Sequence, residues 1–260
     1  MIDSFKLTGK TCFVAGANGR IGQPLCHALA QLGARVIACD QADQDCSGFI
    51  HTLPQVASEP HLALQVDATD EAAVREAIPT DETIDGFVHC IGLTSHASLD
   101  GYVAPVAQQS LSAWRSAIEA NLTSAFILSQ ALEPALRKSD AASIVFVGSI
   151  YAELGPDNSL YQETDMANPI AYGASKGGLL QLMRYLATQW APDIRVNSVS
   201  PGGIEANQPA SFKGRYADRT PLNRMATPND IAGPIAFLLS DAARYVTGHN
   251  LIADGGWSAW

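Results

Sequence analysis

Two side chains that can exchange a proton lie four residues apart in the segment Ala-Tyr-Gly-Ala-Ser-Lys, where Tyr172 precedes Lys176. Because the surrounding run is compatible with a helix, both side chains are predicted to lie on one helical face, one turn apart. A lysine ammonium beside a phenol favours the phenolate, so we expect Lys176 to lower the pKa of Tyr172 from about 10. Such a tyrosine can pass a proton to or from a substrate oxygen. A plain surface pair with no chemical role is the alternative.

A glycine-rich turn lies between the first predicted strand, residues 11–15, and the first predicted helix, residues 21–32. Glycines at such a turn let the backbone approach a pyrophosphate, and the N-terminus of the helix supplies hydrogen-bond donors. A dinucleotide site is therefore expected at Gly16, Asn18, Gly19, Arg20, Ile21 and Gly22.

Asp40 ends the second predicted strand, 18 residues after Gly22. A carboxylate there accepts hydrogen bonds from an adenosine ribose and repels a 2′-phosphate, which favours NAD(H). Arg20 argues in the opposite direction, so NADP(H) stays possible. Asp67 follows the third predicted strand and is expected either to bind the adenine amino group or to cap the next helix.

Strand and helix patterns alternate along the chain, which predicts one doubly wound parallel sheet of about seven strands with helices on both faces. The predicted strands are residues 11–15, 35–39, 62–66, 87–90, 143–147, 195–199 and 251–253. The predicted helices are residues 21–32, 70–77, 111–137, 171–190 and 227–239, the last opened by a capping signal at Thr227 and Asp230. The whole chain, 1–260, is expected to form a single Rossmann-type α/β domain with irregular segments at 150–170 and 202–226.

Composition narrows the class of protein. The 260 residues are 47% hydrophobic and 16% charged, which suits a globular core. The net charge of −10 disfavours nucleic acid or an anionic membrane as partner. No apolar run approaches the roughly 20 residues that span a bilayer, and no signal peptide is visible. Five cysteines without a C-x-x-C pair and scattered histidines predict reduced thiols, a cytoplasmic location and no metal site.

With these features in place, the chain resembles the short-chain dehydrogenases/reductases from Lys10 to Asp254-Gly255-Gly256. The resemblance implies a catalytic set of Asn121, Ser149, Tyr172 and Lys176. It also places Gly92, Pro201, Gly202 and Ile204, with Tyr172 and Lys176, beside the cofactor, and Gly203 beside the substrate. In the implied mechanism Tyr172 is the general acid/base and Lys176 also holds a ribose hydroxyl. Ser149 then donates a hydrogen bond to the substrate oxygen, and Asn121 fixes a water that relays the proton.

The departures from the family pattern are informative. The usual Asn-Asn-Ala-Gly is His89-Cys90-Ile91-Gly92, which predicts altered local hydrogen bonding. The threonine usual after Pro-Gly-x-Ile-x is absent, and Asn207 is expected to substitute for it. Ser149 and Tyr172 are 23 residues apart, more than is usual. Tyr161 lies nearer the customary distance, but Asp165 stands where its lysine should be.

The surplus residues predict an insertion within 155–168, beside the substrate, and Tyr161 is expected to bind substrate. Its acids and amides suit a hydroxyl-rich ligand such as a sugar or polyol, although a solvated acidic loop is the alternative. The segment 202–226 resembles the family's substrate lid. It carries Lys213, Arg215, Arg219 and Arg224, which are expected either to meet a phosphate on the substrate or to balance the acidic insertion.

The leading function is therefore an NAD(H)-dependent oxidoreductase that interconverts a secondary alcohol and a ketone. A 3-oxoacyl-carrier-protein reductase is the second possibility, disfavoured by the acidic net charge and by Asp40. A nucleotide-binding regulatory protein without turnover is the third. The resemblance also implies a homotetramer or homodimer, with Trp257 and Trp260 either at a subunit interface or packed within the chain.

Overall fold

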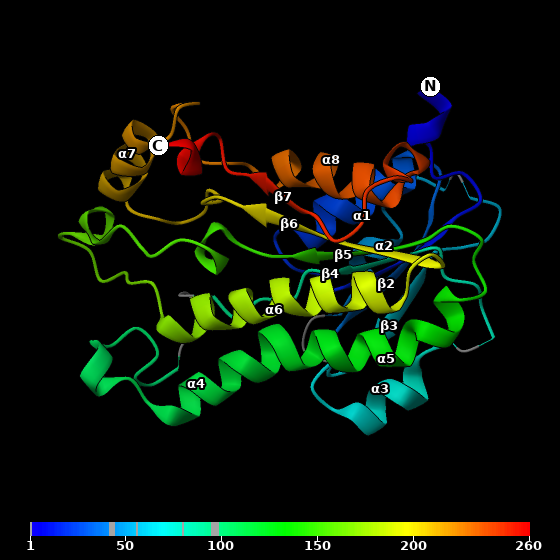
Figure 1. The fold of residues 1–260 in the computed structure, drawn as a ribbon, viewed down its shortest axis with the longest axis horizontal. Helices are drawn as coiled ribbons and strands as arrows, with labels where there is room; N and C mark the ends of the chain where they lie inside the picture. The colour runs from blue at the N-terminus through cyan, green and yellow to red at the C-terminus, as the bar shows by residue number, and fades with distance from the viewer. Residues whose placement is uncertain (1, 42–44, 56, 80, 95–98) are drawn as a thin grey trace.

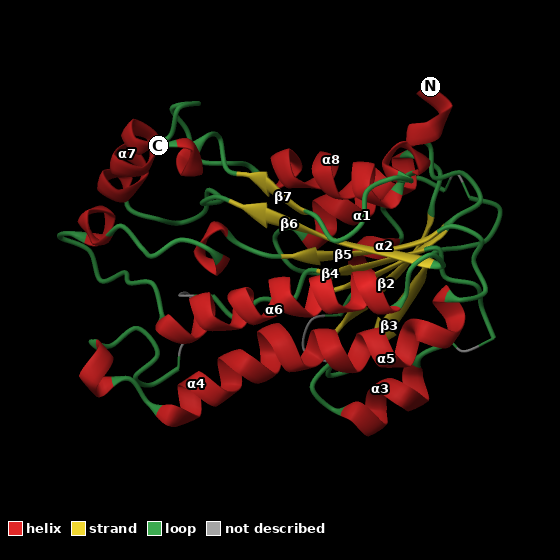
Figure 2. Cartoon of the chain, viewed as in Figure 1, coloured by secondary structure: helices red, strands yellow, loops and turns green. Residues whose placement is uncertain are grey.

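Seven parallel strands form one sheet in the order β3-β2-β1-β4-β5-β6-β7, and helices cover both of its faces (Figures 1 and 2). The computed structural model describes residues 2–41, 45–55, 57–79, 81–94 and 99–260. The predicted doubly wound, Rossmann-type α/β fold is thereby confirmed. Strand order reverses between β1 and β4, which is where folds of this type leave a crevice at the carboxyl ends of the strands.

The strands are β1 (Thr11–Ala15), β2 (Arg35–Asp40), β3 (Leu62–Gln65), β4 (Gly86–His89), β5 (Ala142–Val147), β6 (Ile194–Pro201) and β7 (Asn250–Ala253). The helices are α1 (Gly22–Gln31), α2 (Ser47–Ile50), α3 (Glu71–Ala77), α4 (Leu111–Ile118), α5 (Ser124–Leu136), α6 (Ile170–Gln189), α7 (Ala210–Arg219) and α8 (Pro228–Leu239). Cys90 was expected in the fourth strand but follows its last residue, His89.

Neighbouring residues of each strand enter two different apolar layers, because successive side chains of a strand point to opposite faces of the sheet. Phe13 and Phe87 pack in the layer that also contains buried residues of α5 and α6. Val14 and Val88 pack in the layer that contains buried residues of α1 and α8. Both faces of the central strands are buried, which explains why their sequences read as continuous apolar runs.

The expected long helix over 111–137 is interrupted. A π-helical turn, Glu119–Thr123, separates α4 from α5, and Asn121 lies on it. The Asn121 side chain bonds to the backbone of Leu93 rather than facing solvent. A π turn holds one more residue than an α turn and often marks a functional position. Apolar periodicity does not reveal it, because the pattern continues on both sides.

Helix α7 corrects the expectation of an irregular segment over 202–226. Only Phe212 and Tyr216, one turn apart, are buried in this helix. Two apolar anchors and a central Gly214 give too weak a periodic pattern to predict a helix from sequence. By contrast the capping signal before α8 is confirmed, since Asp230 accepts a hydrogen bond from the Thr227 N–H at 2.7 Å.

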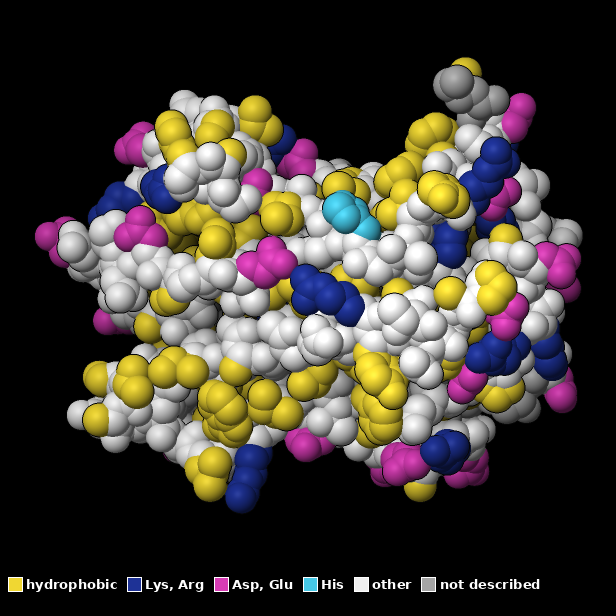
Figure 3. All heavy atoms as spheres, viewed as in Figure 1, with side chains coloured by type: hydrophobic (Ala, Val, Ile, Leu, Met, Phe, Trp, Pro, Cys, Tyr) yellow, Lys and Arg dark blue, Asp and Glu magenta, His cyan; other side chains and the backbone are white. Residues whose placement is uncertain are grey.

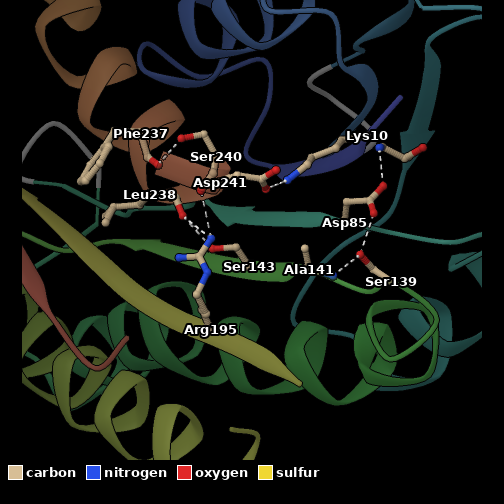
Figure 4. A network of polar contacts seen from close by, with 11 residues as sticks. Lys10, Asp85, Ser139, Ala141, Ser143, Arg195, Phe237, Leu238, Ser240 and Asp241 are labelled. Atoms are coloured by element: carbon tan, nitrogen blue, oxygen red, sulfur yellow. Dashed lines mark hydrogen bonds and ion pairs between the residues drawn. The ribbon is translucent and has the colours of Figure 1, made fainter. Parts of the chain in front are cut away.

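A polar network joins the amino ends of the central strands, opposite the crevice (Figure 4). Arg195, in β6, donates to the Leu238 carbonyl at 2.9 Å, and the Ser143 hydroxyl donates to the same oxygen at 2.9 Å. Lys10 pairs with Asp241 at 2.5 Å. The bonds from Arg195 and Ser143 satisfy the Leu238 carbonyl at the end of α8, where a helix has no internal partner for it.

Apolar side chains also gather on the outer surface of α4 and α5 (Figure 3). Leu111, Trp114 and Phe126 are 61%, 38% and 47% exposed. Among the described residues no helix combines the length and apolar character needed to cross a membrane.

Candidate active site

A cavity of about 590 Å³ opens at the carboxyl ends of the strands and spans the crevice between β1 and β4. Its walls come from the turn after β1, the ends of β2 and β4, the segments that follow β5 and β6, and the start of α6. The predicted residues that line it are Gly16, Gly19, Arg20, Ile21, Gly22, Asp40, Asp67, Gly92, Ser149, Tyr161, Tyr172, Lys176, Pro201, Gly202, Gly203 and Ile204. Asn18 and Asn121 are absent from the wall.

The turn after β1 is a cradle that side chains would fill. Gly16 has φ +77°, and a Cβ there would lie 2.9 Å from the Ile91 nitrogen. A Cβ on Gly22 would lie 2.2 Å from the Gly16 carbonyl oxygen. The turn therefore requires glycine at both positions, and the N-terminus of α1 follows directly. A pyrophosphate fits such a cradle because backbone N–H groups and the helix dipole favour an anion there.

Asp40 lies at the end of β2, where the two oxygens of its carboxylate accept backbone N–H bonds from Asn18 and Gln41, both at 2.9 Å. Asn18 thus fixes the orientation of Asp40 through its backbone instead of lining the cavity. Each carboxylate oxygen can accept more than one hydrogen bond, so ribose hydroxyls can be bound in addition.

Asp67 closes a tight turn on the cavity wall. Its carboxylate accepts hydrogen bonds from the Thr69 N–H at 2.9 Å and the Thr69 hydroxyl at 2.7 Å. The neighbouring α3 is capped by Asp70, which accepts from Ala72 and Ala73. Asp70, and not Asp67, therefore caps the helix. Binding of the adenine amino group is the expectation that is left for Asp67.

Ser149, Tyr172 and Lys176 meet at the centre of the cavity, brought together by the end of β5 and the first turns of α6. The Lys176 ammonium donates to the Val147 carbonyl at 2.8 Å and lies 5.8 Å from the centre of the Tyr172 ring.

The prediction that Lys176 lowers the pKa of Tyr172 is wrong for this structure. Burial raises the pKa of Tyr172 above its ordinary value of 10.0, and the hydrogen bond from Ser149 only partly offsets this. Burial also lowers the pKa of Lys176 to about 8. The lysine is held against Val147 by its hydrogen bond, and its own charge is disfavoured, so it does not act as the strong phenolate partner that spacing predicted.

Asn121 lies fully buried behind the cavity wall. Its Oδ1 accepts from the Leu93 N–H at 2.6 Å, and its Nδ2 donates to the Ser175 hydroxyl at 2.9 Å. The amide thereby ties α6 to the segment after β4, and Leu93 lines the cavity. This arrangement positions the wall of the site, whereas the expected water relay through Asn121 remains a proposal.

His89 replaces the usual asparagine and is fully buried between aromatic rings, with edge contacts to Phe87 and Phe146. Its Nε2 lies 2.8 Å from the Ser124 hydroxyl, which itself donates to the Ala120 carbonyl. Burial lowers the pKa of His89 to about 3, so the ring is neutral at physiological pH. The substitution thus links β4 to the π turn through Ser124.

Sequence reasoning did not single out several polar residues of the cavity wall, and it counted Asn168 only among the acids and amides of the segment 155–168. Tyr151, Asn168 and Gln208 line the cavity, and none belongs to a motif that spacing could single out. Asn207 was expected near the cofactor, but Gln208 takes the place on the wall; its amide bonds to the backbone of Ala206 and Ile204.

The four cations of the 202–226 segment are engaged within the chain. Lys213 pairs with Glu205 at 2.8 Å, and Arg224 pairs with Asp230 at 2.7 Å. Arg215 donates to backbone carbonyls of the insertion, and Arg219 lies over the rings of Trp257 and Trp260. None of the four lines the cavity. These contacts favour charge balance with neighbouring residues over recognition of a substrate phosphate.

Trp257 packs within the chain. It is 4% exposed and stacks on Tyr216 with ring centres 4.5 Å apart, while Trp260 is 69% exposed. The Tyr216 hydroxyl accepts a hydrogen bond from the Gly203 N–H. A Cβ on Gly203 would lie 2.7 Å from the Tyr216 ring, so this contact requires glycine.

None of the five cysteines, all of which lie within the described residues, forms a disulfide. Burial raises the pKa of Cys12 and Cys39 to about 12, so these thiols are neutral apolar fillers in β1 and β2. Across the described ranges, no group of three or more His, Cys, Asp or Glu side chains is arranged to hold a metal ion.

Comparison with known proteins agrees with this geometry. The family model described as enoyl-(acyl carrier protein) reductase matches residues 15–258. Cis-4-hydroxycyclohexanecarboxylate dehydrogenase of Sinomonas cyclohexanicum is 33% identical, over 96% of this chain and 97% of its own length. Galactitol 2-dehydrogenase (L-tagatose-forming) of Cereibacter sphaeroides is 29% identical, over 98% of both chains.

An uncharacterized short-chain type dehydrogenase/reductase of Sinorhizobium fredii is 34% identical over 96% of this chain, which spans only 44% of that relative's length. A crystal structure of a putative short-chain alcohol dehydrogenase from Sinorhizobium meliloti matches with a TM-score of 0.83 and 30% identity, over 98% of both chains. Similar solved structures include complexes with NAD+ and with NADP. The chain therefore belongs to the short-chain dehydrogenase/reductase family of oxidoreductases.

Proposed function

We propose that this protein is an NAD(H)-dependent oxidoreductase that interconverts a secondary alcohol and a ketone on a sugar or polyol. The observation that carries the proposal is the meeting of Ser149, Tyr172 and Lys176 in one cavity with the glycine cradle and Asp40. A proton-transfer group and a dinucleotide site in one crevice are what hydride chemistry at a carbon bearing oxygen requires.

In this proposal the cradle at Gly16, Gly19 and Gly22 holds the pyrophosphate, with Arg20 and Ile21 on its wall. Asp40 binds the adenosine ribose, and Asp67 faces the adenine. Pro201, Gly202, Ile204 and Gly92 lie along the nicotinamide end, where Lys176 holds a ribose hydroxyl. The bound nicotinamide supplies or takes the hydride.

The protein's own groups manage the proton. Ser149 donates a hydrogen bond to the substrate oxygen as charge develops there, and Tyr172 gives a proton to that oxygen or takes one from it. Ser149 and Tyr172 both line the cavity, which supports the proposal that their hydroxyls converge on one point of it. That convergence is what orients a single substrate oxygen.

The NAD(H) preference rests on Asp40. A 2′-phosphate at the end of β2 would approach a carboxylate already fixed by two backbone N–H groups. Arg20 also lines this end of the cavity, so NADP(H) is the alternative cofactor.

The polyol preference rests on the polar wall of the substrate end, where Ser149, Tyr151, Tyr161, Asn168 and Gln208 offer hydroxyl and amide groups. The named activity of the Cereibacter relative, on galactitol, supports it. A 3-oxoacyl-carrier-protein reductase is less favoured, because the cations of 202–226 that would meet an acidic carrier are engaged within the chain. A regulatory protein without turnover is disfavoured by the assembled Ser149, Tyr172 and Lys176.

We also propose a homo-oligomer, a tetramer or dimer, assembled in part through the apolar surface of α4 and α5. Five cysteines that form no disulfide suit the reducing, cytoplasmic environment that we propose.

The central test is Tyr172→Phe. The ring keeps its packing, but the group that exchanges the proton is lost, so turnover should fall by about a thousandfold or more while NAD(H) affinity stays within about threefold. Turnover of galactitol, cyclohexanol and their ketones is followed through NADH absorbance, and affinity through calorimetry. A variant with near wild-type turnover would overturn the assignment of Tyr172. Tyr245→Phe, at a fully exposed tyrosine, is the matched control.

A further inference from the structure

Three polar side chains form a cluster beside the catalytic residues on the cavity wall. Tyr151 follows Ser149 by two residues, and Asn168 precedes α6, the helix that carries Tyr172. Tyr161 ends the short 3-10 turn Asn158–Tyr161 of the insertion. All three line the cavity that contains Ser149 and Tyr172. The cluster is therefore placed to touch a part of the substrate that does not react.

Tyr161 is held rigidly, although it comes from a surface insertion. Its ring packs on Phe212 of α7 with centres 5.5 Å apart. Arg215 of the same helix donates to the carbonyls of Leu160 and Gln162, at 2.9 and 2.7 Å, on either side of Tyr161. The hydroxyl of Tyr161 is thus fixed by its neighbours before any ligand arrives, which lowers the entropy lost on binding.

After the hydrogen bonds within the cluster are made, the cluster can still donate a hydrogen bond to a ligand and accept one from it. The hydroxyls of Tyr151 and Tyr161 lie 3.2 Å apart, and one of the two phenol protons occupies that bond. Burial raises the pKa of both phenols, and hydrogen bonding from the Asn168 side chain, an N–H donor, offsets part of that rise. Within the described residues, no hydrogen bond uses the second phenol proton or the Asn168 Oδ1. A hydroxyl group is the ligand that accepts from one and donates to the other.

The charge of the cavity excludes a different class of ligand. Among the described residues of its wall, the cations are Arg20, at the dinucleotide end, and Lys176, which is 2% exposed and bonded to Val147. A carboxylate or phosphate at the Tyr151 end would meet phenol and amide groups without a counter-charge. Burying an anion without such a partner is costly, whereas burying a hydrogen-bonded hydroxyl is not.

We propose that Tyr151, Tyr161 and Asn168 form a subsite for an uncharged hydroxyl of the substrate, away from the reacting carbon, and that the substrate is a neutral polyol and not a sugar acid or sugar phosphate. The inference rests on the proposed alcohol–ketone activity and narrows its substrate class. Tyr151 is the specificity-determining residue of this subsite, because it adjoins Ser149 and is bonded to Tyr161.

The test compares neutral hexitols with an alcohol that lacks the further hydroxyls and with a charged sugar acid. Oxidation of the hexitols galactitol, D-sorbitol and D-mannitol is measured beside 2-hexanol, which lacks the further hydroxyls, and beside gluconate, which carries a charge. For the best hexitol, the ratio of kcat/KM to that for 2-hexanol should fall by about 5- to 100-fold in Tyr151→Phe, the cost of an unmet buried hydrogen bond. Tyr245→Phe, the matched control far from the cavity wall, should leave that ratio unchanged.

A binding measurement tests the proposed subsite independently of turnover. Calorimetry of each hexitol with the enzyme saturated with NADH should show binding that weakens by a similar factor in Tyr151→Phe and in Asn168→Ala. Equal losses of kcat/KM for hexitol and 2-hexanol in Tyr151→Phe would show a merely structural role and overturn the subsite. A wild-type preference for gluconate over every hexitol would overturn the neutral-substrate assignment.

Different results would overturn the proposed activity and the proposed subsite. If 2-hexanol or cyclohexanol is oxidised and no hexitol is oxidised or bound, the subsite is wrong and the proposed activity stands. If no alcohol is oxidised with NAD+ or NADP+, the proposed activity is wrong. The calorimetry then decides the subsite by itself, and binding that is absent or independent of Tyr151 overturns it.

Discussion

Burial, more than neighbouring charge, controls the two titrating residues at the centre of the site. Tyr172 and Lys176 lie on one face of α6, as their spacing predicts, but the ammonium is directed to the Val147 carbonyl. The folded protein disfavours the charged form of both groups, so the pKa of Tyr172 is raised and that of Lys176 is lowered to about 8. The phenol of Tyr172 is therefore protonated at neutral pH, the state from which the proposed acid/base chemistry would begin.

The lowered pKa of Lys176 has a consequence for stability. Between pH 8 and the ordinary lysine pKa of 10.5 the unfolded chain binds more protons at this residue, so its contribution to stability improves as pH rises through that window. Lys176→Met removes this dependence. The melting temperature of the variant minus that of the wild type should therefore be larger at pH 7 than at pH 10, by differential scanning calorimetry without cofactor. An equal difference at both pH values would contradict the burial argument.

Asp40 offers a second test at the residue scale. Asp40→Asn keeps a side-chain oxygen for the Asn18 or Gln41 N–H but removes the negative charge. The ratio of kcat/KM for NADP(H) to that for NAD(H) should rise by about tenfold or more, since the repulsion of a 2′-phosphate is lost. Steady-state kinetics with both cofactors measures it, and Asp45→Asn, an exposed neighbour, is the control. An unchanged ratio would remove Asp40 from cofactor selection.

At the scale of elements, helix α7 and the insertion form one unit. Arg215 ties the helix to two carbonyls of the insertion, and Phe212 packs on Tyr161. Tyr216 joins the same unit to Gly203 and Trp257. This unit therefore brings together segments that are distant in sequence, and Arg215 joins two of them, α7 and the segment 155–168.

Removing the hydrogen bonds of Arg215 should increase the local opening of the segment that contains Leu160 and Gln162. In Arg215→Met, amide hydrogen exchange over residues 158–164 should accelerate by about tenfold, because the carbonyls of Leu160 and Gln162 lose their donor. Lys213→Met, which breaks only the surface pair with Glu205, should leave those rates within about twofold. Unchanged protection in Arg215→Met would show that ring packing alone holds the insertion, and mass spectrometry resolves the two outcomes.

At the scale of the whole molecule, the exposed apolar surface of α4 and α5 is the feature that a single chain does not explain. Figure 3 shows this surface, and Phe126 of α5 is 47% exposed. If copies of the chain meet there, Phe126→Glu places an uncompensated charge in the interface and should shift the protein to a smaller species in analytical ultracentrifugation. Arg75→Glu, on the exposed side of α3, should leave the mass unchanged. A wild-type monomer would contradict the proposed oligomer.

Much of the fold was predictable because its signals are local. The continuous apolar runs of β1 and β5, the turn at Gly16 to Gly22 and the capping box at Thr227 depend on residues close in sequence. The positions of Ser149, Tyr172 and Lys176 on a strand end and a helix start followed from the same patterns. Helix α7 and the π turn at Asn121 were missed, because their geometry depends on contacts with Trp257 and Leu93 from elsewhere in the chain.

The sequence by itself determined the alternation of strands and helices, the glycine cradle, and which tyrosine has a lysine four residues on. These are properties of short segments, where backbone preference and periodicity act directly. Only the tertiary structure decided that burial raises the pKa of Tyr172, that the cations of 202–226 face their own chain, and that Tyr151, Tyr161 and Asn168 meet. Desolvation and long-range pairing depend on what the folded chain brings together, and spacing along the sequence does not contain that information.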